Sequence, residues 1–544
     1  MQSSGYRQPT PAKGVFTAPY RGKCRHRSPP SAVSTPVLSF TTVSAKCPVT
    51  LSQASNVPPS GPPFSKRKKL FITTTAMWVT WNSNLGSSLP SNAATAIQLD
   101  LAIARAPLVW LNSLYMLGYA IGPLLFGPLS EHIGRRPVIL YAYAGYMLCT
   151  MACALSDRFA LLLAFRFLTG FVASAPNATV GGLLADAHPE QGERGRAMAY
   201  FTCAAVAGPL FGPLVSGFAQ AHSWQLVFWV GFAIAGVGLP LPLLLPETFA
   251  PVLEKRRARA AGDAVEEEAV SGSSEKSLAA ELRIVFTRPA VMMVKEPIVL
   301  WTALYLALVY SILYLFFQAY PVIFQGVYDL SPGMIGLGYL PILAGILLAL
   351  AGVFIYDAQL AKYRTRGSRW ASNETHRRLP LAYIGGPLVT LGLFWLGWSS
   401  TRTVHPAVPL LSGLPFGAGY MLIFVAMVNH LSDAYRASSA SAHSAASTTR
   451  SLAAAFLPVA AAPMYAALSV PWACSLLGFA ALALSAVPFV FVRFDAAIRR
   501  RSPQKILNRS DESEHAYKTC SAQHEELLDR QYRFYWQGRA LRLH

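Results

Sequence analysis

Charged residues are scarce in this sequence. Asp, Glu, Lys and Arg make up 13% of its 544 residues, whereas hydrophobic residues make up 53%. Soluble domains carry about twice that share of charge, roughly 25%, because charged side chains cover a surface that faces water. A surface that faces lipid needs no such cover. The composition therefore argues against an ordinary soluble enzyme and favours an all-α membrane protein.

Acidic residues are missing from the start of the chain. Residues 1–69 contain Lys and Arg but no Asp or Glu, and they are rich in Pro and Ser. Such a segment cannot bury enough apolar surface to fold, so we predict a disordered basic tail there. A mitochondrial transit peptide has a similar composition. However, Pro29, Pro30, Pro58 and Pro59 would interrupt the amphipathic helix that such a peptide needs.

Clusters of metal-binding residues are also missing. The seven cysteines are scattered, without a CxxC pair or a Cys/His group, so we expect no metal site, no disulfide framework and no cofactor. The formal net charge of +20 comes from short Lys and Arg runs between long apolar stretches. A nucleic-acid-binding protein would instead gather its basic residues on one face. We therefore expect the lipid bilayer, and no nucleic acid, as a partner.

Long apolar runs are what the sequence does contain. Runs of roughly 20 residues, enough to cross about 30 Å of hydrocarbon, begin at residue 70. We predict twelve spans, at 70–93, 108–128, 137–155, 159–184, 197–219, 224–245, 298–323, 333–356, 380–399, 408–431, 438–466 and 472–492. They form two six-helix halves, residues 70–245 and 298–492. A cytoplasmic linker at 246–297, with a helical piece near 275–287, joins these halves.

The loops between these spans alternate in charge. Every second loop is rich in Lys and Arg, which is typical of the cytoplasmic side. These loops contain Arg135, Arg136, Arg194, Arg196, Lys255, Arg256, Arg257, Lys362, Arg364, Arg366, Arg369, Arg377, Arg378, Arg436, Arg493 and Arg499. The other loops contain only Arg105, Arg158 and Arg402. We therefore predict both termini in the cytoplasm, including a C-terminal tail at 493–544.

The loop between the second and third spans carries a motif. It contains Gly127, Glu131, Gly134, Arg135 and Arg136 in the string GPLSEHIGRR. Its glycines permit a tight turn at the membrane surface, and its acid and arginines can pair across helix ends and hold two helices in one conformation. The string resembles the loop signature of the major facilitator superfamily, G-x-L-x-D-x-x-G-R-[KR]. One departure is the glutamate, which stands where that family usually has aspartate.

Two further strings resemble signatures of the same superfamily. In the fourth span, Arg166 and Gly170 match its R-x-x-x-G element. In the fifth, Gly208, Gly212, Pro213 and Gly217 resemble the glycine-proline signature of antiporters, with Ser216 in place of one glycine. Glycines four residues apart share a helix face and allow another backbone to come close, and a proline weakens the helix. A plain packing interface and a hinge both fit, and the resemblance implies a role in gating.

Three strings look like the fungal twelve-helix drug:proton antiporter branch of that superfamily. They are residues 82–90, 246–249 and 314–321, and the whole resemblance covers approximately residues 70–495. It implies the major facilitator fold. With no organelle signal in the sequence we expect the plasma membrane as the default location, and we expect a monomer. The function that the resemblance implies is proton-coupled export of drugs, polyamines or an endogenous metabolite, with a small molecule and protons as partners. A specific importer and a passive uniporter are the alternatives. The spans lack the catalytic cluster of a membrane-embedded enzyme, and two groups of six helices differ from seven-helix receptors.

Two arginines fall inside the predicted spans. Arg166 lies about 12 Å from the outer end of the fourth span, at about 1.5 Å per residue. An arginine at such a depth costs roughly 2.5–3.5 kcal/mol on insertion scales, so it should face the protein interior. It is a candidate for coupling ligand binding to helix movement, and backbone carbonyls that satisfy its guanidinium are the alternative. Arg450 in the eleventh span poses the same question, and the two arginines could favour an organic acid as substrate.

Amides and aromatic residues in the spans are candidates for a central substrate cavity, because they suit varied, partly apolar or cationic compounds. These candidates are Asn82, Asn84, Tyr115, Asn177, Tyr314 and Gln318. Acidic residues are nearly absent from the middle of the spans, which weakens a proton-coupling mechanism based on a buried carboxylate. His443 is an ionisable candidate for that coupling, with a packing role as the alternative.

Overall fold

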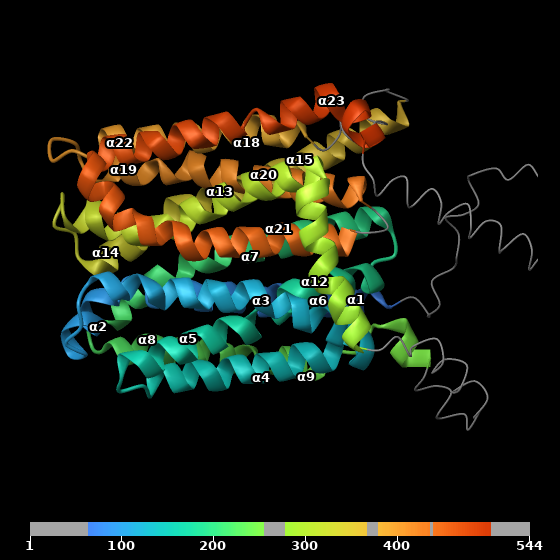
Figure 1. Cartoon of the computed structure of the whole chain (residues 1–544), viewed down its shortest axis with the longest axis horizontal. Helices are drawn as coiled ribbons and strands as arrows, with labels where there is room; N and C mark the ends of the chain where they lie inside the picture. Colours follow the sequence, from blue (N-terminus) through green and yellow to red (C-terminus); the bar gives the residue numbers. More distant parts are fainter. Residues whose placement is uncertain (1–63, 255–277, 367–378, 436–438, 502–544) are drawn as a thin grey trace, which may run out of the picture. The chain divides into compact units, whose positions relative to one another are not determined.

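The chain is built from long helices that run alongside one another (Figure 1). The computed structural model describes residues 64–254, 278–366, 379–435 and 439–501, and the regular elements in these ranges are helices. The all-α prediction is confirmed for this part of the chain. Most of the two predicted tails, at 1–69 and 493–544, and much of the predicted linker lie outside the described residues.

The first half contains the predicted spans from residue 70 to residue 245. Its helices are α1 (Lys66–Ser88), α2 (Ala94–Asp100), α3 (Trp110–Ile133), α4 (Arg135–Ala154), α5 (Phe159–Ala173), α6 (Ala175–Ala187), α7 (Gln191–Ala219), α8 (Trp224–Gly238) and α9 (Pro240–Leu244). A 3₁₀ turn at Ala106–Val109 leads into α3. The fourth predicted span corresponds to α5 and α6, which meet at Ser174, and the sixth corresponds to α8 and α9.

The second half begins after α12 (Leu278–Lys295), a helix near the piece predicted at 275–287. The helices that follow are α13 (Pro297–Tyr320), α14 (Pro332–Leu337), α15 (Leu340–Thr365), α18 (Pro380–Ser399), α19 (Ala407–Leu411), α20 (Gly413–Ala434), α21 (Ser439–Phe456), α22 (Ala461–Leu484) and α23 (Val487–Arg501). A π-helical turn at Pro321–Gln325 extends α13.

Ten helical stretches of the described residues are long and apolar enough to cross a membrane. The polar helix α1 is not among them, although it fills the first predicted span. The last stretch, Ser441–Phe494, has 54 residues, far more than the roughly 20 that one crossing needs, and its helical backbone is interrupted at Ser469. With α1 added and this stretch divided, the described residues are consistent with the predicted twelve crossings.

Several polar side chains of α1 are compatible with an apolar bundle because they bond to their own helix. The Thr73 and Thr75 hydroxyls donate to the carbonyls four residues earlier, at 2.9 Å each. The Asn84 amide donates to the Thr80 carbonyl, also at 2.9 Å. A buried polar group that is satisfied in this way avoids most of the cost of leaving water. Polar residues therefore do not prevent α1 from crossing the membrane.

The short helices α2, α14 and α19 lie together at the left of Figure 1, and α12 lies toward the right. We call these the outer end and the inner end, after the sides that the charge pattern predicts. The two halves touch along α3 and α21 and along α7, which contacts α14 and α15. At the inner end, α12 packs against α3 of the first half and α21 of the second.

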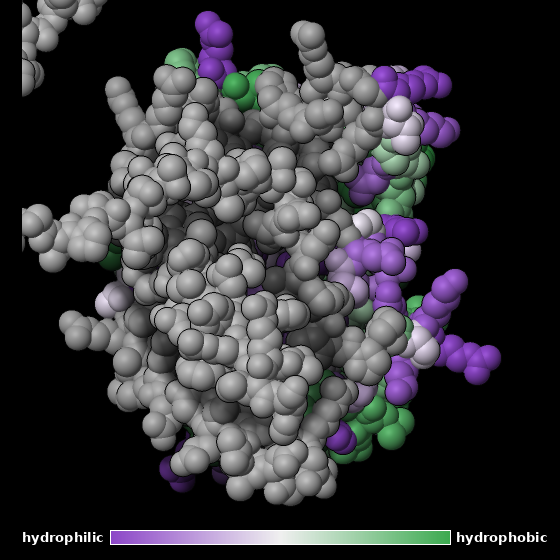
Figure 2. Space-filling view, turned by 90° about the vertical axis from the view of Figure 1, so that its right-hand side faces the viewer, coloured by the Kyte–Doolittle hydropathy of each residue, from purple (hydrophilic) through white to green (hydrophobic). Residues whose placement is uncertain are grey.

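Figure 2 views the molecule from its inner end. Where described residues are visible, hydrophilic side chains gather along one rim, with hydrophobic side chains beside them. Exposed basic residues in the loops and helix ends of this side are Lys66, Arg67, Lys68, Arg194, Arg196 and Lys362. Basic residues beside apolar helices are typical of a surface that meets the cytoplasmic leaflet.

Candidate functional site

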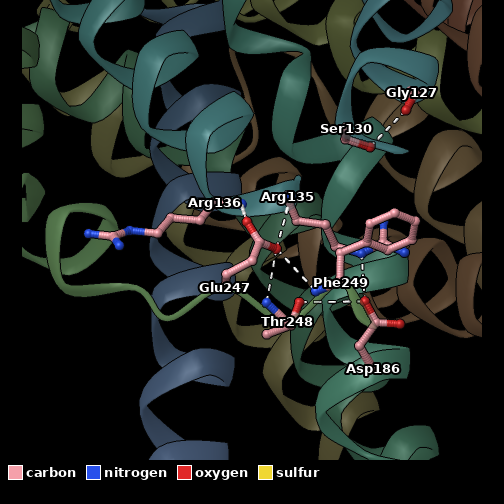
Figure 3. Close-up of polar contacts among 8 residues, drawn as sticks. All are labelled: Gly127, Ser130, Arg135, Arg136, Asp186, Glu247, Thr248 and Phe249. Atoms are coloured by element: carbon pink, nitrogen blue, oxygen red, sulfur yellow. Dashed lines mark hydrogen bonds and ion pairs between the residues drawn. The ribbon is translucent and has the colours of Figure 1, made fainter. Parts of the chain in front are cut away.

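The predicted loop motif forms the turn between α3 and α4 at the inner end (Figure 3). Gly134 has φ 105° and ψ 160°, a region of backbone conformation that is open essentially only to glycine. A Cβ atom built there would lie 2.5 Å from Oε2 of Glu247. Glycine at position 134 therefore both permits the turn and leaves room for this carboxylate.

Glu247 binds the start of α4. Its Oε1 accepts from the Arg135 amide at 3.1 Å, and its Oε2 accepts from the Arg136 amide at 3.2 Å. Oε1 also accepts from the Thr248 amide at 2.9 Å and the Phe249 amide at 3.0 Å. The residue is only 6% exposed. A carboxylate at a helix N-terminus satisfies amides that lack partners within the helix and matches the helix dipole, so Glu247 ties the end of the first half to α4.

The Arg135 side chain joins three segments of the first half. Its Nε donates to Oδ2 of Asp186, at the end of α6, over 2.6 Å. Its guanidinium lies 5.2 Å from the centre of the Phe249 ring. Arg136 instead donates to the Leu243 carbonyl at 3.0 Å. The arginines of the motif therefore hold α4, α6, α9 and the segment after α9 in one arrangement, through partners other than the acid of the motif, and their role in conformational change stays a prediction.

The partners of these arginines were not predicted. Glu131, the acid of the motif, is exposed at the last turn of α3. Asp186 is not among the predicted site residues, and Glu247 belongs to the string at 246–249 that resembles the drug:proton antiporter branch. Spacing gives no signal for the contact, because Glu247 follows Arg135 by 112 residues.

Replacing Gly134 by alanine is expected to lower the free energy of unfolding of the first half by about 1–3 kcal/mol, the usual cost of such a backbone strain. The new methyl group would also displace the Glu247 carboxylate. The apparent Tm in detergent, measured against Gly127→Ala, checks this. Gly127 lies on α3 with no neighbouring atom within 4 Å of an added Cβ, so that variant should unfold at or above the wild-type temperature. Equal Tm values for the two variants would contradict the account.

Arg166 lies on α5 and is 1% exposed. Its Nε donates to the Leu111 carbonyl, and its Nη1 and Nη2 donate to the carbonyls of Gly86 and Ser87, each at 2.8 Å. The guanidinium also lies 4.5 Å from the centre of the Tyr115 ring. These contacts are the ones expected if backbone carbonyls satisfy the charge of the guanidinium, which is the alternative to a coupling role. Arg166 joins α5 to the outer part of α1 and to α3, and its role in coupling stays a prediction.

Gly170 lies one turn further along α5, where the backbone of α3 crosses. An added Cβ would lie 2.0 Å from the Tyr115 carbonyl oxygen, so no larger residue fits without moving the helix. The ring of Tyr115 covers Arg166, and its hydroxyl donates to the Ser83 carbonyl. Arg166 and Gly170 therefore fix α1, α3 and α5 as one unit.

The predicted glycine faces of α7 meet two different helices. Added Cβ atoms at Gly208 and Gly212 would lie 2.7 Å from Cβ of Asn84 and 2.1 Å from Oγ of Ser88, both near the outer end of α1. An added Cβ at Gly217 would lie 2.5 Å from the Pro332 carbonyl oxygen, at the start of α14. The close approach predicted for this helix is confirmed. Its last turns lie between the first half and the second.

Asn92, in the turn between α1 and α2, bridges the halves at the same place. Its Nδ2 donates to the Pro213 carbonyl of α7 at 2.9 Å and to the Pro332 carbonyl at 3.3 Å. Its own backbone amide donates to the Ser216 hydroxyl at 3.2 Å. Proline at 213 leaves α7 unbroken. We call Asn92, Pro213, Gly217 and Pro332 the outer junction, and it closes the outer end between α7 and α14.

Replacing Asn92 by aspartate is expected to open the outer junction. Aspartate keeps the shape of the side chain but cannot donate to two carbonyls. Losing these bonds costs about 1–2 kcal/mol, which changes the ratio of closed to open molecules about fivefold to thirtyfold. The distance between spin labels at Asp157 and Arg402, exposed residues of the two halves at this end, should lengthen in a larger share of molecules.

The matched control for this variant is Asn112→Asp. The Asn112 amide donates to the Ser91 hydroxyl at 3.1 Å, and both residues belong to the first half. Loss of this hydrogen bond should leave the distance between the two spin labels unchanged. An Asn92→Asp variant with the wild-type distribution of distances would show that the junction does not control the outer end.

The six predicted cavity residues differ in their bonds: some bond within the first half, and two bond across the halves. Asn82 and Asn84 are buried and bond within the first half, the former donating to the Tyr143 hydroxyl at 3.0 Å. Tyr115 also bonds within this half, as described above. Gln318 is partly buried near the outer end of α13.

Two of these residues bond across the halves. The Tyr314 hydroxyl of α13 lies 2.6 Å from the Ser87 hydroxyl of α1. The Asn177 amide of α6 donates to the Ser447 hydroxyl of α21, also at 2.6 Å. Residues of both halves thus lie where the substrate cavity is predicted. A substrate-binding role for the six predicted residues stays a prediction.

His443 on α21 lies beside α20. Either Nε2 of its ring or the Ser432 hydroxyl donates across the 2.7 Å between them. This contact lies within the second half, which fits the packing alternative as well as a role in coupling. The pair is near the inner ends of α20 and α21.

A cavity between the halves lies toward the inner end. It is lined by Gly195 and Ala199 of α7, Tyr356 and Asp357 of α15, Leu381 of α18 and Asn429 of α20, among others. Polar and apolar side chains thus meet where three helices of the second half face α7.

Comparison with known proteins gives consistent matches. A family model described as Major Facilitator Superfamily matches residues 71–458. The chain is 35% identical over 395 residues to "Efflux pump FUBT" of Fusarium oxysporum, a match that covers 72% of this chain and 66% of the pump. It is 34% identical over 433 residues to "Ascochitine biosynthesis cluster MFS transporter" of Didymella fabae, a match that covers 78% of this chain and 82% of that transporter.

A solved structure of the proton:xylose symporter XylE, bound to 6-bromo-6-deoxy-D-glucose, has the same fold. It aligns with a TM-score of 0.57 and 15% identity, over 79% of this chain and 96% of that one. At this identity the likeness concerns the fold alone.

Proposed function

Because this chain belongs to the Major Facilitator Superfamily, and is thus a multi-pass membrane transporter and not an enzyme, we propose that it exports small organic molecules in exchange for protons. The observation that carries the proposal is the position of α7. Its glycine face packs on α1 of its own half, and its last turn packs on α14 of the other half. A helix placed in this way can open or close the outer end as the halves move.

The direction of transport rests on similarity. The names of two relatives describe an efflux pump and a transporter of a biosynthesis cluster. A glycine-proline helix of the antiporter type supports the same direction. The exported compounds would be drugs or other xenobiotics, polyamines, or a secondary metabolite or toxin, and we place the protein in the plasma membrane as a monomer.

Proton coupling needs a group that binds and releases a proton. In the predicted spans no carboxylate lies near the middle. His443, near the inner end of α21, is an ionisable side chain within the eleventh predicted span. The scarcity of acids favours the second candidate function, passive uniport through the same fold. Both candidates use alternating access, in which two halves rock about a site between them.

Transport by the purified protein in liposomes separates these candidates. Labelled drugs, polyamines and organic acids would be offered outside vesicles that hold the protein, with the interior acidified relative to the medium. Accumulation above equilibrium that collapses when a protonophore is added is the expected result. If the compounds only equilibrate across the membrane, whatever the pH gradient, the protein is a uniporter and the antiport proposal is wrong. His443→Gln should abolish accumulation while counterflow of unlabelled against labelled compound continues.

A further inference from the structure

Arg450 differs from Arg166 in how its charge is satisfied. It lies 11 residues after the start of α21 at Ser439, about 16 Å along the helix at about 1.5 Å per residue, and thus near the middle of the span. Its side chain is only partly buried. Nη2 donates to the Ser447 hydroxyl at 3.1 Å, and Nε has no hydrogen-bond partner among the described residues.

No carboxylate forms an ion pair with Arg450 in the part of the chain that the structure describes. A guanidinium has five N–H donors arranged as a planar fork, so most of this fork is unused. An unpaired charge at this depth is costly, and such residues usually mark a ligand or ion pathway. An anion would therefore supply the partner that this charge lacks among the described residues.

Two aromatic rings lie beside the guanidinium. It lies 5.1 Å from the centre of the Tyr310 ring and 5.4 Å from that of Phe424. These rings belong to a larger group on α13 and α20: Tyr310 and Tyr314 lie 5.0 Å apart, and Phe424 and Tyr420 lie 4.9 Å apart. The Tyr310 and Phe424 rings lie 6.1 Å apart, next to each other beside the guanidinium, and provide an apolar wall for a ligand.

This group faces the junction of the halves. Ser447, which holds Arg450, also accepts from Asn177 of the first half at 2.6 Å. Tyr314 touches Ser87 of the first half. A ligand bound here would contact both halves, as a transported substrate must in alternating access.

We propose that Arg450 is the anion-binding residue of the substrate site, and that the substrates are organic acids with one carboxylate and an aromatic or apolar body. This inference rests on the proposed transport function and narrows its substrate class. The carboxylate would accept two parallel bonds from the guanidinium, and the body would lie against Tyr310 and Phe424. Polyamines and other cations would be repelled by the unpaired charge.

The test compares two probes of one shape, naphthalene-2-carboxylate and naphthalene-2-carboxamide, at a pH at which the acid is ionised. Binding to the purified full-length protein is measured by titration calorimetry, and uptake is measured in liposomes. We expect the wild type to bind the carboxylate at least tenfold more tightly than the amide. Arg450→Gln should weaken carboxylate binding about tenfold to a hundredfold, the usual worth of a charge-assisted pair, and change amide binding less than about twofold.

Arg450→Lys keeps the charge but not the fork, and it should lose about tenfold in carboxylate affinity at an unchanged Tm. This variant carries the test if Arg450→Gln fails to fold. Arg402→Gln, in an exposed loop at the outer end, is the matched control and should bind as the wild type does.

The outcomes separate this inference from the export proposal. Equal binding of acid and amide, or carboxylate binding that survives both Arg450 variants, would overturn the anion site, even if a pH gradient still drives uptake of neutral or cationic compounds. Failure of the wild type to bind the carboxylate at all would overturn it as well. Arg450-dependent binding of the carboxylate without gradient-driven uptake would support the site and contradict proton-coupled export.

Discussion

Replacing Arg166 by alanine is expected to lower the free energy of unfolding by about 3–5 kcal/mol, the range for breaking a buried charged network, and to abolish transport. Three carbonyls, those of Gly86, Ser87 and Leu111, would lose their donor in a place closed to water. The outer part of α1 would then separate from α3 and α5. Thermal unfolding in detergent and uptake in liposomes measure the two effects.

Two further variants make this prediction specific. Arg166→Lys places one ammonium where three carbonyls converge, and it should recover part of the Tm but little of the transport. Arg158→Ala, in the exposed turn just before α5, should change neither. An Arg166→Ala variant that unfolds at the wild-type temperature but does not transport would instead assign Arg166 to coupling alone.

Replacing Glu247 by alanine is expected to lower the stability of the first half by about 2–4 kcal/mol, because four backbone amides lose a charged acceptor. The start of α4 would also lose a negative charge that matches its dipole. Glu247→Gln should retain part of the stability, since its carbonyl oxygen can still accept some of these bonds. Apparent Tm and transport rate are the measurements.

The matched control is Glu193→Gln, which removes an acid from the same end of the first half. Glu193 pairs with Lys69 at 2.6 Å and is 34% exposed. Exposed or half-exposed pairs contribute little, so its effect on the Tm should be small. If the two variants lowered the Tm equally, the bonds from Glu247 to the start of α4 would not have the importance assigned here.

The course of the helices was predictable because lipid imposes a simple rule. A backbone in hydrocarbon must satisfy its own polar groups, so apolar runs of crossing length become helices. Even polar α1 follows it, since its hydroxyls bond to carbonyls of the preceding turn. Breaks within a span were not predictable. The interruption between α5 and α6 at Ser174 depends on local geometry that hydropathy does not describe.

The candidate site was predictable only where neighbours in sequence form it. The spacing of Gly208 and Gly212 places them on one helix face, which predicts a close approach to another helix, and this face packs against α1. The partner of the loop motif, Glu247, and the bridge of Asn92 to Pro332 join residues more than a hundred positions apart. Such contacts depend on how the helices assemble. For the same reason the sequence does not distinguish Arg166 from Arg450. Only their partners in the structure show that Arg166 is satisfied and that Arg450 has no ion pair among the described residues.

Alternating access requires the two halves to open the outer end as they close the inner end. Two distances in the same protein, with its natural cysteines replaced, measure this movement. One joins spin labels at Asp157 and Arg402 at the outer end, and the other joins labels at Lys68 and Lys362 at the inner end. The account predicts that a transported compound lengthens the outer distance and shortens the inner one together. Distances that stay constant while transport proceeds would contradict it.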